Sequence, residues 1–139
     1  MIEPARFPFV DVDPSLAESS LMPLLPLTLS KGEMVVSAYG LLDSGAAVNV
    51  LPYSLGEQLG FVWEEQRTSI VLSGNLARLS ARGIVLSAII APFSAVRLAF
   101  AWTQSDNVRL LLGQANFFME FDVCFFRSQS QFEVTPKEL

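Results

Sequence analysis

Short apolar runs separated by turn-forming residues recur along most of this chain of 139 residues. Residues 24–29 and 34–42 flank a turn at 30–33, so the pattern predicts a β-hairpin. Pro26 has no N–H to give to a ladder, and we therefore expect the first of these strands at a sheet edge. The hairpin is the first clear structural unit of the sequence.

The rest of the pattern predicts mainly strands. Further runs predict strands at residues 48–51, 61–72, 84–91, 96–102, 108–112, 123–126 and 131–134, and residues 76–82 alternate as a hairpin arm does. Pro52 and Gly60 bracket a short helix at 52–59, and residues 114–121 predict a second. The strands lie too close together for βαβ units. The sequence predicts an all-β domain, built as a barrel or sandwich, with one or two short helices.

The length favours one domain with an N-terminal extension. Residues 1–20 contain three prolines and four acidic residues, and we expect them to form an extended arm. The domain itself is expected to span residues 21–139.

The composition limits the kinds of partner that the protein can be expected to bind. The chain is 51% hydrophobic and 17% charged, against about 25% charged in typical domains, which favours a subunit interface. Its net charge is −5 and it has no basic stripe, so we expect neither nucleic-acid binding nor attachment to anionic membranes. The longest apolar stretch, residues 84–93, is about half a membrane span, and no signal pattern opens the chain. One cysteine, Cys124, forms no internal disulfide; we expect it to be buried and the protein to be cytoplasmic.

The chain contains no histidine. This excludes Ser-His-Asp and Cys-His catalysis and the usual zinc enzymes, and no nucleotide-binding glycine loop is present. We expect no metal and no cofactor. Any acid–base chemistry must come from carboxylates, or less favourably from a lysine or tyrosine.

One carboxylate stands out, in the hexapeptide Leu-Leu-Asp-Ser-Gly-Ala at residues 41–46. Asp43 follows an apolar strand, and a buried carboxylate is costly unless it is paired or hydrogen-bonded. Gly45 permits a sharp turn that brings N–H groups to the carboxylate, Ser44 can lock a neighbouring loop, and Ala46 leaves room for a ligand. The same residues also form ordinary turns, so a functional and a purely structural role both remain open.

The hexapeptide resembles the active-site loop of the retropepsin-like aspartic proteases, whose motif is two apolar residues, Asp, Ser or Thr, Gly, and Ala or Ser. A second element of that family, two apolar residues and a glycine before a short helix, matches Leu111, Leu112 and Gly113. The resemblance covers roughly residues 24–121. It implies a closed or partly open β-barrel with a flap hairpin, and we expect the tip of that flap at Ser73-Gly74-Asn75, preceded by Leu72.

The resemblance also implies a mechanism. Each chain would supply one Asp43, and two chains would build one active site at a two-fold axis, as an isologous homodimer does. One carboxylate would activate a water and the other, protonated, would polarise the carbonyl of a peptide or protein substrate. Ser44, Gly45 and Ala46 would support the loop, and the flap would close over the substrate.

The chain departs from the family pattern in two places. Its flap stretch has a single glycine, and Gln114 and Asn116 stand where many members carry an Arg-Asp pair. Two alternatives therefore stay open beside an aspartic endopeptidase. The first is an inactive peptide-binding or dimerisation module on the same fold, and the second is a structural β-domain in which Asp43 belongs to an ordinary turn.

Overall fold

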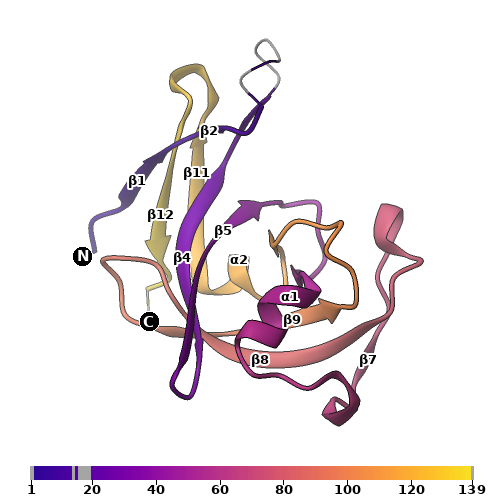
Figure 1. Ribbon diagram of the computed structural model, residues 1–139. Helices are drawn as coiled ribbons and strands as arrows, with labels where there is room; N and C mark the ends of the chain where they lie inside the picture. The colour runs from indigo at the N-terminus through magenta and orange to yellow at the C-terminus, as the bar shows by residue number, and fades with distance from the viewer. Residues whose placement is uncertain (1, 14, 16–19, 139) are drawn as a thin grey trace.

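The computed structural model describes residues 2–13, 15 and 20–138, and its centre is a closed β-barrel (Figure 1). Six strands form the barrel in the order β4, β5, β10, β6, β9, β8, and β8 pairs back with β4. Their bounds are Leu24–Lys31 (β4), Met34–Leu42 (β5), Leu111–Leu112 (β10), Asn49–Leu51 (β6), Val96–Thr103 (β9) and Ala81–Ile89 (β8). The predicted all-β barrel is confirmed.

The β4–β5 hairpin has the predicted position. Leu29 lies opposite Val36, and the turn uses Gly32 at φ 59°, in the left-handed region that glycine adopts without strain. Leu25, Leu27 and Leu29 alternate with more exposed residues, so one face of β4 packs into the barrel. This alternation is the reason that the sequence located the hairpin well.

The helix α1 (Tyr53–Gln58) closes one side of the barrel. Pro52 stands at its N-cap, and Gly60 follows it at φ 87°, as the sequence predicted. Tyr53 stacks on the fully buried Trp102 with ring centroids 5.4 Å apart, and the Trp102 Nε1–H donates to the Tyr53 carbonyl at 3.1 Å. Within the described residues, no helix is long and apolar enough to cross a membrane.

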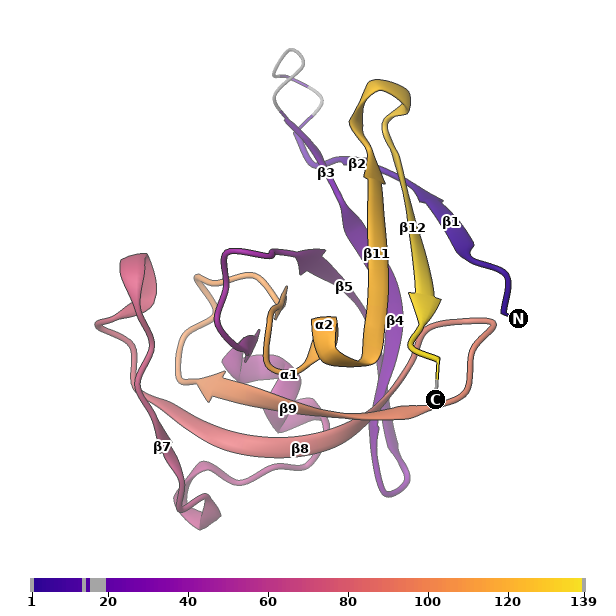
Figure 2. The ribbon, with the colours of Figure 1, turned by 180° about the vertical axis from the view of Figure 1, so that it is seen from behind.

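A three-stranded sheet stands beside the barrel. It has the order β1, β12, β11, with bounds Ala5–Pro8, Gln131–Pro136 and Phe121–Phe126. The predicted final hairpin is therefore confirmed, and β1 adds a third strand to it (Figure 2). A separate short ladder joins β2 (Val10–Asp11) to β3 (Leu21–Met22).

The prediction that residues 1–20 form a distinct arm stays a prediction, and residues 1, 14 and 16–19 lie outside the described residues. The prediction that Cys124 is buried is wrong, because Cys124 is exposed. The side chains of Phe121 and Val123 pack on the core from one face of β11. Because side chains alternate along a strand, the side chain of Cys124 lies on the opposite, exposed face.

The sequence prediction fails between residues 61 and 82. The expected long strand at 61–72 is replaced by the 3-10 turn η2 (Trp63–Glu65) and the short strand β7 (Ser69–Ile70), which pairs with β8. The expected arm at 76–82 is also wrong, because η3 (Gly74–Leu76) and a turn precede β8. Leu76 and Leu79 pack on the same apolar cluster, so their spacing of three belongs to turns rather than to a strand.

Candidate active site

Asp43 lies directly after β5, where β10 fixes the end of that strand. β10 runs parallel to β5 with Leu111 beside Leu41 and Leu112 beside Leu42. The Asp43 N–H donates to the Leu112 carbonyl at 3.0 Å. The two apolar pairs that the sequence singled out are therefore neighbours in one sheet, and the backbone of Asp43 is held by the second of them.

The residues after Asp43 form a tight loop around its carboxylate. The Gly45 N–H donates to Asp43 Oδ1 at 3.0 Å, and the Ala46 N–H donates to the Asp43 carbonyl at 3.0 Å. The apolar residues before Asp43 suggested a buried side chain, but Asp43 is only half-buried. Ser44 is exposed, and its carbonyl accepts a hydrogen bond from the Gln114 side chain at 2.8 Å. The loop thus holds the carboxylate while leaving it open to a ligand.

Gly113 lies against the back of this loop. A Cβ at Gly113 would come within 2.5 Å of the Val48 carbonyl oxygen and 2.7 Å of that of Ala46, so only glycine allows the two segments to approach this closely. Beyond it, the Gln114 N–H donates to the Ala46 carbonyl and the Ala115 N–H to that of Ala47, both at 2.9 Å. The second sequence element therefore supports the first through its backbone.

Sequence reasoning missed Asn49, which is 0% exposed. Its Oδ1 accepts the Gly113 N–H at 2.8 Å, and its Nδ2 donates to Asn116 Oδ1 at 3.1 Å. A polar residue inside the apolar run at residues 48–51 was the available signal. Gln114 and Asn116, which stand where many members of the family carry an Arg-Asp pair, both contribute uncharged hydrogen bonds to this support.

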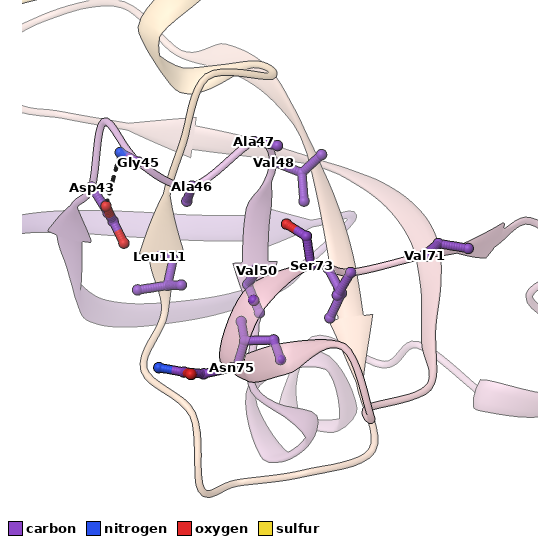
Figure 3. A pocket seen from close by; sticks show the side chains of 13 residues that line it. Asp43, Gly45, Ala46, Ala47, Val48, Val50, Val71, Ser73, Asn75 and Leu111 are labelled. Carbon is purple, nitrogen blue, oxygen red and sulfur yellow. Dashed lines mark hydrogen bonds between the residues drawn. The ribbon is translucent and has the colours of Figure 1, made fainter.

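A cavity of about 450 Å³ opens in front of Asp43 (Figure 3). Its lining comes from two sides, the loop with its neighbouring strands and the predicted flap: Asp43, Gly45, Ala46, Ala47, Val48, Val50, Leu111, and Val71, Leu72, Ser73, Gly74, Asn75, Leu76. The structure thus brings together Asp43, Gly45, Ala46, Leu111 and all four predicted flap residues. Ser44, Leu112 and Gly113 support the loop from outside this lining.

The flap is a loop at residues 71–80 carried by the short β7–β8 pair. Leu72, 6% exposed, packs with Val50, Ala81 and Ala101 in an apolar cluster of its own. Val71 lies at the rim of the cavity and is 94% exposed, whereas Asn75 extends toward the side where Leu111 lies (Figure 3). The flap is therefore anchored at Leu72, while its tip stands over the cavity.

Asp43 is the one ionisable side chain among the residues that line the cavity. The other walls are apolar, small or neutral, which suits an uncharged segment of polypeptide. Across the described residues, no three His, Cys, Asp or Glu side chains gather in a way that would hold a metal ion. The cavity of one chain therefore offers the chemistry of a single carboxylate, held by the Gly45 N–H.

Comparison with known proteins identifies the fold. No family model matches the sequence, and no curated protein matches it. The structure is similar to the crystal structure of a retropepsin-like aspartic protease from Rickettsia conorii, with a TM-score of 0.65 and 13% identity. The match covers 95% of this chain and 91% of that one. The chain therefore has the retropepsin-like fold over nearly its whole length, as the sequence motifs indicated.

Proposed function

We propose that the protein is a homodimeric aspartic endopeptidase that hydrolyses peptide or protein substrates. Two copies each contribute one Asp43 at a two-fold axis, because one chain of this size carries a single Asp-Ser-Gly loop. The observation that carries the proposal is the cavity in which Asp43 faces the predicted flap. The retropepsin-like fold adds support.

In the proposed reaction the two carboxylates share one proton, since like charges at close range do not both ionise easily. The ionised member takes a proton from a water that attacks the scissile carbonyl, and the protonated member donates to the carbonyl oxygen. Gly45 holds the Asp43 carboxylate through its N–H. Leu72 anchors the flap, and Ser73, Gly74 and Asn75 cover the bound peptide and exclude water. We further propose a cytoplasmic location, since a lone cysteine suits a reducing compartment.

Cleavage profiling with a peptide library tests the proposal. We expect the wild type to cleave with an acidic to mildly acidic optimum and pepstatin-like compounds to inhibit it. Asp43→Asn removes the ionisable group but keeps its shape, so it should abolish cleavage and leave the circular dichroism spectrum unchanged. Full activity of Asp43→Asn would refute the mechanism. A stable monomer without cleavage at any pH would favour a peptide-binding module on the same fold.

A further inference from the structure

The buried side chain of Asn49 connects three separate parts of the barrel. Besides the Gly113 N–H, its Oδ1 accepts the Phe117 N–H at 3.4 Å, at the start of α2 (Phe117–Glu120). Its Nδ2 donates to the Ala99 carbonyl of β9 at 2.9 Å, in addition to Asn116. Asn49 therefore ties β6 to β9 and to the segment that supports the Asp43 loop.

Asn116 completes this connection from the other side. Its Oδ1 accepts from Asn49 and from the Ala99 N–H at 3.0 Å, and its Nδ2 donates to the Arg97 carbonyl at 3.1 Å. Among the described residues, no buried side-chain nitrogen or oxygen lacks a partner. A fully satisfied network of this kind is rigid, and removing one member leaves buried groups unpaired.

We propose that Asn49 is a positioning residue for catalysis, which sets the place of Asp43 through the segment at residues 112–113. This inference rests on the proposed endopeptidase function. The path is short: Asn49 Oδ1 holds the Gly113 N–H, and the preceding carbonyl, that of Leu112, accepts the Asp43 N–H. A shift of Gly113 therefore moves the backbone anchor of Asp43.

The position requires an uncharged side chain with both an acceptor and a donor. An amide offers a carbonyl oxygen to two N–H groups and an NH₂ to two oxygens, whereas an ionised carboxylate only accepts. In Asn49→Asp the introduced carboxylate would face the Ala99 carbonyl and Asn116 Oδ1, and both are acceptors. Protonation restores one donor, so burial and these oxygens should raise the pKa of the introduced carboxyl.

The test is the ratio of kcat for Asn49→Asp to kcat for the wild type across pH, with a fluorogenic peptide taken from the library screen. We expect a ratio near one in acid that falls about 100-fold at higher pH, because a displacement near 1 Å costs about that much. KM should change less than kcat. The matched control is Asn107→Asp, which makes the same chemical change at an exposed residue and should keep a ratio near one throughout.

A purely structural role gives a different result. The melting temperature of Asn49→Asp would then fall. Its kcat, divided by the folded fraction that near-ultraviolet circular dichroism measures, would stay at the wild-type value at every pH. That result would overturn the inference. If Asn49→Asp does not fold, Asn116→Ala replaces it, because Asn116 is only half-buried; we expect about a tenfold lower kcat, and an unchanged kcat would overturn the inference. A wild type that cleaves no peptide would instead refute the proposed function.

Discussion

The close approach of Gly113 to the Asp43 loop gives the strongest prediction for a single substitution. In Gly113→Ala the added methyl would lie 2.5 Å from the Val48 carbonyl oxygen and 2.8 Å from its carbonyl carbon. An ordinary carbon–oxygen contact is about 3.3 Å, so the first distance is short by about 0.8 Å. The obstacle is backbone and not the end of a flexible side chain, so the two segments must separate.

The separation has two costs. Overpacking of this kind destabilises by about 1–3 kcal/mol. Movement of the Ala46 and Ala47 carbonyls also stretches two backbone hydrogen bonds of 2.9 Å, each contributing about 1 kcal/mol. We expect Gly113→Ala to lower the free energy of unfolding by about 3–5 kcal/mol. The proposed peptidase activity should fall by about 100-fold in this variant, since the loop that carries Asp43 moves.

Urea unfolding followed by tryptophan fluorescence measures the first quantity. Gly32→Ala is the matched control, because Gly32 has a positive φ of 59° and no atom within 4 Å of an added Cβ. It should cost only about 1–2 kcal/mol, from backbone strain, and leave activity unchanged. A Gly113→Ala protein as stable as the wild type, or no more destabilised than Gly32→Ala and equally active, would refute the close-packing argument.

Three further substitutions test the packing around the barrel. Gly56→Ala would place a methyl group against the Trp102 indole and break the hydrogen bond from the Trp102 Nε1–H to the Tyr53 carbonyl. This substitution should lower the free energy of unfolding by about 2–3 kcal/mol and shift the tryptophan emission. Phe7→Ala removes the stacking of β1 on Phe132 and should cost about 2–3 kcal/mol by urea unfolding. Arg6→Ala removes the exposed ion pair with Glu133, a hydrogen bond to Gln131 and the contact with the Phe126 ring, and should cost about 1 kcal/mol. Equal losses in these two variants would contradict this account of the β1 contact.

The sequence predicts well those parts of the fold in which the apolar periodicity agrees with the burial of the side chains. The β4–β5 hairpin alternates cleanly between core and surface, and α1 has proline at its start and glycine after its end. The structure of residues 61–82 could not be predicted from the sequence, because the buried residues of this stretch make local contacts. Trp63 packs against Trp102 from a 3-10 turn, and Leu72 anchors a loop, so neither belongs to a long strand.

The residues of the candidate site also differ in how well the sequence predicts them. Asp43 and Gly113 could be found because their neighbours form short motifs with a fixed order. Asn49 stands out only as one polar residue in an apolar run, and that signal does not reveal its partners Ala99 and Asn116, which lie 50 and 67 residues further along the chain. Hydrogen-bond networks between distant residues depend on the assembled barrel, and periodicity carries no information about them.

The central claim, that Asp43 forms a catalytic dyad with the same residue of a second copy, is tested most directly by a crystal structure of the protein at its pH optimum. The account predicts an isologous dimer in which the two Asp43 carboxylates lie about 3 Å apart across the two-fold axis, with a flap over each side of the shared cleft. A monomer, or a dimer in which the two Asp43 carboxylates face separate regions of solvent, would contradict it.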